Sequence, residues 1–259
     1  MTEKEFVTNL VQSAADLAKT KSADMVVSTK HGDPRDMLTS IDIEVSEYIR
    51  QAIQAAYPND TFYSEEAEIE AVDQGRVWLI DPIDGTSNYI RNLPMYSTCI
   101  TLIENGAFRL FAMAAPCLNQ LFYIDTTEVL ENGDPITTNT TTQPHEAYIA
   151  FHPGRKPEGY SWAGSMLQFL LANAKKNCNY GSSALELCYL ASGRLDTVIY
   201  GTLTPIDIYG AVEAVRRAGG EVYNARTMQP LTMTRQPERI VAVANTALWT
   251  AWQEINLPL

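Results

Sequence analysis

Two hydrophobic periods organise the first part of this chain. Over residues 3–20, apolar positions recur every three or four residues, which predicts an amphipathic helix. The same period returns near residue 40, where Thr39 or Ser40 can cap a helix start. It stops at residues 58–60, which read PND. The pattern therefore predicts two helices before the first strand.

Strand-like stretches follow these helices. We expect short or buried strands at residues 61–63, 77–80, 97–103, 108–114 and 121–124. The pair Asn105-Gly106 stands between two of these stretches and is a strong hairpin signal. These features predict helices packed on an antiparallel sheet in the first half.

The second half alternates strands with helices. Strands are expected at residues 147–151, 197–200 and 240–244, and helices at residues 162–174, 182–192, 208–218 and 247–255. This alternation indicates an α/β layer. Residues 132–144 are rich in Thr, Asn and Pro, so we place the join there. We predict an N-terminal α+β half over residues 1–135 and a C-terminal α/β half over residues 136–259, which count as one domain or two.

The composition limits the choice of partners. A chain of 259 residues with 46% hydrophobic residues can bury a large core. Its formal net charge is −12, from 31 acidic and 19 basic residues, so it repels nucleic-acid phosphates and anionic membranes. We therefore expect no nucleic-acid or membrane partner, but cations or small substrates that arrive with cations.

Cysteine and histidine are scarce in the chain. The four cysteines form no C-x-x-C pair and there are three histidines, which argues against a zinc site. The first residues lack the basic and apolar segments of a signal peptide, and no apolar run is long enough to span a bilayer. We expect a cytoplasmic protein with reduced thiols.

The segment at residues 81–86, DPIDGT, combines groups that bind metal and phosphate. Asp81 and Asp84 place two carboxylates at a strand end, and hard divalent cations prefer such oxygen ligands. Gly85 lets the backbone approach a ligand. A helix that begins near Thr86 would direct its unpaired N–H groups at a phosphate. The alternative is an Asp-Pro turn followed by an Asp-Gly turn.

Three further acidic positions stand near the ends of predicted elements. Glu65 follows a short strand and is either a metal ligand or part of a solvated acidic loop. Asp42 and Asp207 each stand at the start of a predicted helix, where ordinary helix capping also explains a carboxylate, and at Asp207 capping is by itself the better explanation. None of the three identifies a site alone.

Together and in this order, these segments resemble the inositol monophosphatase family. The family pattern has a Glu-Glu element, an apolar strand into D-P-[IL]-D-G-T-x-N, and a late Asp at a helix that is followed by A-G-G. This chain reads FYSEE at residues 62–66, VWLIDPIDGTSN at 77–88, ID at 206–207 and AGG at 218–220. Residues 181–184, GSSA, and 191–196, ASGRLD, resemble the family's G-[ST]-A-A…A-x-G-x-x-D segment.

The resemblance implies a layered α/β (α+β) fold, an αβαβα sandwich of the sugar-phosphatase type, with two or three Mg²⁺ ions. Glu65, Asp81 and the Ile83 carbonyl would hold one ion, Asp81, Asp84 and Asp207 a second, and a third, weaker ion would lie near Glu65. The activity implied is hydrolysis of a small phosphate monoester by a metal-activated water, without a phosphoenzyme. We expect Asp84→Asn to abolish turnover and to leave the fold intact.

The same resemblance implies catalytic and substrate-binding residues. It gives catalytic roles to Glu65, Thr86 and Asp42, the last two as a pair that helps to activate the attacking water. It gives substrate binding to Asp84, Gly85, Thr86, Ser183, Tyr200 and Asp207. Family members are commonly dimers, so we also expect a homodimer.

Departures from the family pattern bear on the substrate. Ile206 stands where the family often has Trp, and Tyr200 stands where inositol-selective members place a glutamate that bonds sugar hydroxyls. This weakens the case for inositol phosphate, and Tyr200 either stacks on a substrate ring or packs in the core. Residues 152–156, HPGRK, either add positive charge to the pocket or form a solvated loop.

Several alternatives stay open. A relative within the family would act on NADP(H), histidinol phosphate, a sugar bisphosphate or adenosine 3′,5′-bisphosphate, and the last usually goes with longer chains. A non-catalytic regulatory homologue would keep the metal pocket and bind a partner, although every predicted ligand is intact. A Rossmann nucleotide-binding protein is set aside because no G-x-G-x-x-G follows a strand.

Overall fold

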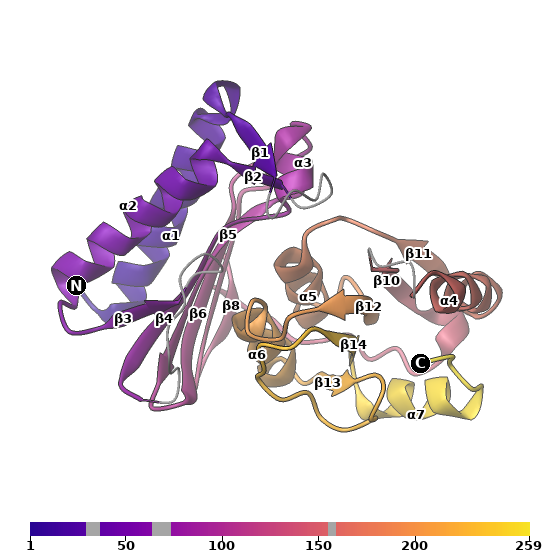
Figure 1. The fold of residues 1–259 in the computed structure, drawn as a ribbon. Coiled ribbons are helices and arrows are strands. Elements are labelled where there is room, and N and C mark those ends of the chain that lie inside the picture. The colour runs from indigo at the N-terminus through magenta and orange to yellow at the C-terminus, as the bar shows by residue number, and fades with distance from the viewer. Residues whose placement is uncertain (30–36, 64–73, 155–158) are drawn as a thin grey trace. The chain divides into compact units, whose positions relative to one another are not determined.

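The computed structural model describes residues 1–29, 37–63, 74–154 and 159–259 (Figure 1). The chain forms two compact units. Unit 1 comprises Met1–Pro135 together with Gly181–Leu185, and unit 2 comprises Ile136–Tyr180 and Glu186–Leu259. The sequence prediction placed residues 181–185 in the C-terminal half, whereas the structure places them in unit 1. Their contacts, described below, explain the difference.

Three helices of unit 1 begin where the sequence predicts: α1 (Glu3–Thr20), α2 (Ser40–Ala56) and the short α3 (Thr86–Ile90). The 3₁₀ turn η1 (Ser22–Asp24) was not predicted. Thr39 caps α2 in a capping box, in which its side chain accepts from backbone N–H groups and Asp42 bonds back to the cap residue. This reciprocal pairing explains why α2 begins at Ser40 in spite of an ordinary helix propensity there.

The main sheet of unit 1 has seven strands in the order β3-β4-β5-β6-β7-β8-β9. Their bounds are β3 (Thr61–Tyr63), β4 (Arg76–Asp84), β5 (Ser97–Glu104), β6 (Ala107–Ala115), β7 (Gln120–Asp125), β8 (Val129–Glu131) and β9 (Asp134–Pro135). Only β3 and β4 are parallel; the other pairs are antiparallel. Asn105 and Gly106 turn the β5–β6 hairpin with φ values of 51° and 78°, as their sequence predicts.

Helices α1 and α2 lie side by side over one face of this sheet (Figure 1). Val11 of α1 and Ile49 of α2 meet Trp78 of β4 and Ile100 of β5 in one core cluster, and all four are fully buried. Strand β4 lies inside the sheet between β3 and β5. The DPIDGT segment at its end therefore starts from one of the most firmly held strands of unit 1.

Unit 2 contains a five-stranded sheet in the order β11-β10-β12-β14-β13. The strands are β10 (Tyr148–His152), β11 (Lys176–Cys178), β12 (Thr197–Leu203), β13 (Glu221–Asn224) and β14 (Glu238–Val243). Strand β10 is parallel to β11 and β12, whereas β14 is antiparallel to β12 and β13. The helices are η2 (Pro144–Glu146), α4 (Tyr160–Asn173), α5 (Ser183–Ala191), α6 (Tyr209–Arg217) and α7 (Thr246–Glu254).

Helices α4 and α7 share one face of the unit 2 sheet (Figure 1). Leu170 and Trp252 from these helices pack with Ile149 and Val241 from the strands in one buried cluster. The alternation of strands and helices predicted for this half is therefore confirmed. The first turn of α5 belongs to unit 1 and the rest of the helix to unit 2.

The sequence missed six short strands. They are β8, β9, β11, β13 and an antiparallel pair, β1 (Val27–Thr29) with β2 (Met37–Thr39). Each has two to four residues, and β1 and β9 are exposed throughout. A strand of two to four residues is too short to show an alternation of apolar and polar residues. Such a strand forms because its backbone bonds to a neighbouring strand, and the sequence does not show that neighbour.

Every helix in the described parts of the chain is too short or too polar to cross a lipid bilayer. No disulfide joins any two of the four cysteines.

Ile100 tests how strongly the core of unit 1 holds the strand next to the motif. Ile100→Ala should lower the free energy of unfolding by about 2–5 kcal/mol, because it leaves a cavity beside β4. Urea denaturation measures this change. Leu93→Ala, at a half-exposed position, should cost less than about 0.5 kcal/mol. Equal losses in both variants would contradict the packing described here.

Candidate active site

A β-bulge turns two carboxylates of β4 to the same face. In a regular strand, residues three apart point to opposite faces. Here Asp81 pairs with Cys99 and Asp84 pairs with Ser97, so three steps on β4 match two steps on β5. Because Ser97 and Cys99 share a face, so do Asp81 and Asp84.

The carboxylate of Asp84 is buried and receives hydrogen bonds on both oxygens. Its Oδ1 accepts from Ser183 N at 3.1 Å and Ser183 Oγ at 2.9 Å. Its Oδ2 accepts from Ser182 Oγ, from Ala184 N at 3.0 Å and more weakly from Ser97 Oγ at 3.4 Å. The residue is 8% exposed. Asp84 therefore caps the N-terminus of α5 from a distance of about a hundred residues in sequence.

These contacts explain why residues 181–185 belong to unit 1. Burial raises the pKa of Asp84, and the hydrogen bonds from Ser182, Ser183 and Ala184 oppose that rise. Ser183, assigned to substrate binding by resemblance, bonds Asp84 through both its N–H and its hydroxyl. Ser182 was not singled out from sequence, although it stands inside the GSSA segment.

Gly85 adopts a left-handed conformation, with φ 91° and ψ 36°, and is the cap residue of α3. A Cβ atom at this position would lie 2.9 Å from Met95 O and 3.2 Å from Gly181 O. The glycine is thus required by conformation and by space. Thr86 follows as the first residue of α3, and its Oγ1 donates to Ile83 O at 3.0 Å.

Asp42 stands next to the helix that Thr86 opens. Its Oδ2 accepts from Thr39 N at 2.8 Å and Thr39 Oγ1 at 2.6 Å. Helix α3 packs against β2, the strand that ends at Thr39. Burial raises the pKa of Tyr89 in α3 to about 12, and the negative charge of Asp42 adds to the rise. The structure therefore brings the N-terminus of α2 and α3 into one neighbourhood, as the assigned pair requires.

Two site residues assigned by resemblance lie in unit 2. Asp207 stands in the turn between β12 and α6, where its N–H donates to Thr204 O at 3.1 Å. The sequence expected this aspartate to open a helix, but α6 begins two residues later with Ile208 as its cap. Tyr200 lies on β12 and is 2% exposed, which agrees with the packing alternative.

A buried glutamate that the sequence did not single out holds Tyr200 in place. Glu186 is fully buried, and its Oε2 accepts from Tyr200 Oη at 2.9 Å. The same oxygen lies 2.6 Å from His152 Nε2, and Oε1 accepts from Tyr180 N at 2.6 Å. In the sequence, Glu186 is the one charged residue of the otherwise mostly apolar predicted helix 182–192. A charged residue among apolar ones was the one sequence feature that indicated a buried polar role for Glu186.

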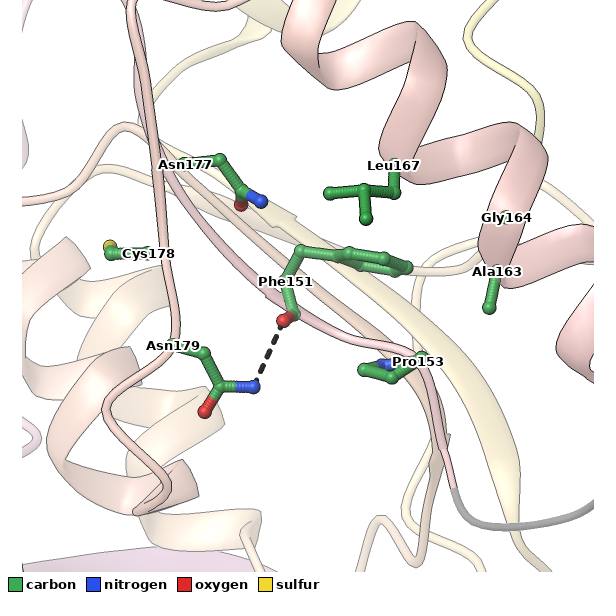
Figure 2. Close-up of a pocket in the computed structure, with 8 residues that line it drawn as sticks. All are labelled: Phe151, Pro153, Ala163, Gly164, Leu167, Asn177, Cys178 and Asn179. Atoms are coloured by element: carbon green, nitrogen blue, oxygen red, sulfur yellow. Dashed lines mark hydrogen bonds between the residues drawn. The ribbon is translucent and has the colours of Figure 1, made fainter.

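His152 belongs to this cluster, whereas residues 155 and 156 of the HPGRK stretch lie outside the described residues. The His152 ring lies 5.0 Å from the Tyr200 ring, and Asn179 Nδ2 approaches its Nδ1 at 3.3 Å. Asn179 also donates to Phe151 O (Figure 2). Asn179 lines a pocket of about 480 Å³ beside α4, together with Pro153 of the HPGRK stretch. None of the described residues predicted to bind metal or substrate lines it.

The donors in the described part of unit 1 suit a hard cation. Asp81, the Ile83 carbonyl and Asp84 offer the oxygen ligands that Mg²⁺ prefers. Glu65 lies outside the described residues. Among the described residues, no three or more His, Cys, Asp or Glu side chains cluster to hold a metal ion. The fit to magnesium thus rests on the oxygen donors of residues 81–84 and not on a cluster of carboxylates among the described residues.

Known proteins resemble this chain in sequence and in fold. A model of the Inositol monophosphatase family matches residues 3–255. The Thermotoga maritima fructose-1,6-bisphosphatase/inositol-1-monophosphatase is 30% identical over 189 residues, 73% of this chain and 71% of the relative. The Nus factor SuhB of Escherichia coli (strain K12) is 30% identical over 205 residues, 78% of this chain and 76% of the relative. A solved Thermotoga maritima IMPase matches with a TM-score of 0.85 at 24% identity, over 99% of this chain and 100% of that one.

Fold and site define a mixed α/β protein in which an acidic β-bulge precedes a left-handed glycine at a helix start. The structural match confirms the predicted α/β fold class. The chain belongs to the inositol monophosphatase family, as its motifs predicted.

The hydrogen bonds of Asp84 change the expectation for its amide variant. Asp84→Asn places an NH₂ group against donors such as Ala184 N–H, so it should lower the free energy of unfolding by about 1–3 kcal/mol. Urea denaturation measures the loss, and Asp24→Asn, at an exposed position, is the control. An unchanged stability would refute the role of Asp84 as the cap of α5.

Gly85 and Gly75 form a matched pair of left-handed glycines. Gly85→Ala combines backbone strain with a steric clash, whereas Gly75→Ala, at φ 68°, meets no atom within 4 Å. Gly75→Ala should cost about 1–2 kcal/mol of stability from strain alone. Gly85→Ala should cost at least about 1 kcal/mol more. Thermal unfolding compares the two, and equal costs would show that the space around Gly85 is not limiting.

Proposed function

We propose that this chain is a magnesium-dependent phosphatase that hydrolyses a small-molecule phosphate monoester through a metal-activated water. The observation that carries the proposal is the β4 bulge. It turns Asp81 and Asp84 to one face, directly before the left-handed Gly85 and the start of α3. Membership of the inositol monophosphatase family supports the same chemistry.

In this proposal Asp81, the Ile83 carbonyl and Asp84 hold magnesium, together with Glu65 and Asp207, as two or three ions. Bound magnesium supplies charge neutralisation and lowers the pKa of a water molecule. Asp84 can admit a cation because the hydroxyls of Ser182 and Ser183 rotate. The N–H groups of Ser183 and Ala184 are fixed by α5 and keep the carboxylate oriented.

The surrounding residues bind the phosphate and orient the water. The backbone at Gly85 and Thr86 approaches the phosphate because no Cβ stands in the way, and the first N–H groups of α3 lack partners inside the helix. Thr86 and Asp42 position the attacking water. Asp42 is fixed for this task by its two bonds to Thr39.

The residues proposed to bind metal and phosphate do not select the alcohol that is esterified to the phosphate. The Tyr200 hydroxyl donates its hydrogen bond to Glu186. Because Tyr200 stands where inositol-selective relatives have a glutamate that bonds sugar hydroxyls, this supports a substrate other than inositol phosphate. NADP(H), histidinol phosphate and a sugar bisphosphate are the candidates within the family. The relative named fructose-1,6-bisphosphatase/inositol-1-monophosphatase supports the sugar bisphosphate.

We also infer a homodimer in the cytoplasm. Helix α4 exposes Leu167, which lines the pocket in Figure 2, and Leu171 one turn later, at 40% and 71%. Exposed apolar side chains one helical turn apart favour association. Four cysteines without a disulfide between them suit a reducing compartment.

A second candidate function is regulatory. One relative is named a Nus factor, which favours a homologue that binds a partner through an otherwise intact fold. Such a protein would release no phosphate from any substrate of a broad panel.

Phosphate release with and without Mg²⁺ tests the phosphatase. The panel contains inositol 1-phosphate, NADP, histidinol phosphate and fructose 1,6-bisphosphate. Removing Mg²⁺ with EDTA should abolish release, and Asp81→Asn should lower kcat/KM by about a thousandfold or more. Asp134→Asn, at an exposed position, should leave the rate unchanged. Release that persists in EDTA or in Asp81→Asn would overturn the proposed mechanism.

A further inference from the structure

The pocket beside α4 belongs to unit 2 alone. Its described lining residues come from β10, β11, α4 and the chain that follows the two strands, and all of them lie within this unit (Figure 2). Its volume of about 480 Å³ falls in the range of about 300–1,000 Å³ that is typical of small-molecule sites. The pocket therefore has room for a compound of one or two rings.

The walls of this pocket are apolar and fixed. Phe151 of β10 is 5% exposed, and its ring meets the Trp162 ring edge-on, with 5.7 Å between the ring centroids. Pro153, Ala163 and Leu167 add further apolar surface. Among the described residues that line the pocket, none carries a charge. Walls of this composition favour a neutral compound with a flat apolar surface.

Asn177 supplies an acceptor that the described chain leaves unused. In β11 it pairs with Ile149 of β10, whose side chain packs with Leu170 of α4, so Asn177 lies on the face of the sheet that α4 covers. Its Oδ1 is buried and has no hydrogen-bond partner among the described residues. Figure 2 shows the Asn177 amide facing the same space as Leu167 and Phe151. Because a buried acceptor without a partner is unfavourable, a ligand that donates an N–H group to Oδ1 gains affinity there.

Gly164 keeps the pocket open on the side of α4. It stands in the second turn of this helix and lines the pocket together with Leu167, three residues later. A glycine inside a helix is less stable there than an alanine. A Cβ atom at Gly164 would meet no atom within 4 Å, so no neighbouring residue requires the glycine. What the glycine does provide is space inside the pocket.

We propose that this pocket binds a neutral, planar ring compound that donates an N–H group to Asn177 Oδ1. The residues proposed to hold metal and phosphate do not line it, so the site is independent of the phosphatase activity. A second copy of the chain, packed on Leu167 and Leu171, is the competing occupant. The ligand is favoured because the unused Oδ1 is buried inside the hollow, where contact with an apolar helix face does not satisfy it.

Three indole compounds test the class of ligand. Indole is neutral and flat and donates one N–H group, 1-methylindole lacks this donor, and indole-3-carboxylate carries a negative charge. Saturation-transfer NMR measures each dissociation constant. The shift of the Asn177 side-chain amide signal, assigned through its loss in Asn177→Leu, locates the bound compound.

We expect indole to bind, and the other two compounds to bind at least about threefold more weakly. The reason is a lost hydrogen bond in 1-methylindole and a charge placed in an uncharged pocket in indole-3-carboxylate. No saturable binding of indole, or equal affinities for all three compounds, would overturn the inference.

Two leucine variants of α4 test the place of binding. Gly164→Leu fills the pocket, whereas Ser165→Leu adds the same side chain at the next, exposed position, which does not line it. Gly164→Leu should weaken indole binding about tenfold or more, and Ser165→Leu should leave it unchanged. Asn177→Leu should weaken it about three- to tenfold through the lost hydrogen bond. Equal effects of the two α4 variants would refute the site.

Folding and association are checked on the same variants. Because leucine favours a helix more than glycine does, Gly164→Leu should raise the midpoint of thermal unfolding by about 1–3 °C. Gly164→Ala, a smaller change, repeats the test if the leucine variant does not fold. In analytical ultracentrifugation, Gly164→Leu should sediment as the unchanged chain does. A changed sedimentation together with no binding of indole would assign the pocket to a second copy and overturn the inference.

Discussion

The buried carboxylate of Asp84 is the interaction on which the arrangement of the site depends. It satisfies the N–H groups of Ser183 and Ala184 at the start of α5, and it does so from the end of β4. A buried carboxylate without such donors would be strongly destabilising. The donors therefore fix Asp84, and Asp84 in turn fixes where residues 181–185 lie. One side chain thus joins the DPIDGT motif to a helix start far along the chain.

The same carboxylate has two roles that compete for its lone pairs. As a cap it accepts five hydrogen bonds, and as a proposed metal ligand it must release some of them. The hydroxyl donors of Ser182 and Ser183 are the ones that can turn away, since the backbone donors are held by the helix. Ligand binding at Asp84 and the order of the first turn of α5 are therefore linked through one side chain.

The buried polar side chains of unit 2 bond mainly to one another. Glu186 accepts from the Tyr200 hydroxyl and the Tyr180 backbone N–H. It also lies within hydrogen-bond distance of His152, so the Glu186, Tyr200 and His152 side chains are held by one another rather than left for a ligand. The side chains around Glu186 are therefore fixed by the fold of unit 2 itself. Arg239, in contrast, is held by an aromatic ring that uses none of its donors.

The sequence by itself determined the long elements, the family and the motif at residues 81–86, because helix periods, a turn pair and a run of ligand residues are local properties. For the same reason it predicted a cap of α2 at Thr39 or Ser40, of which the structure has Thr39, and a hairpin at Asn105-Gly106. Tertiary structure alone decided that Asp81 and Asp84 share a face, because the bulge is defined by pairing with β5. It also decided that residues 181–185 join unit 1 and that Glu186 holds Tyr200. Those features depend on hydrogen bonds between residues that are distant in sequence. Such bonds produce no periodic pattern of apolar and polar residues, so the sequence alone does not predict them.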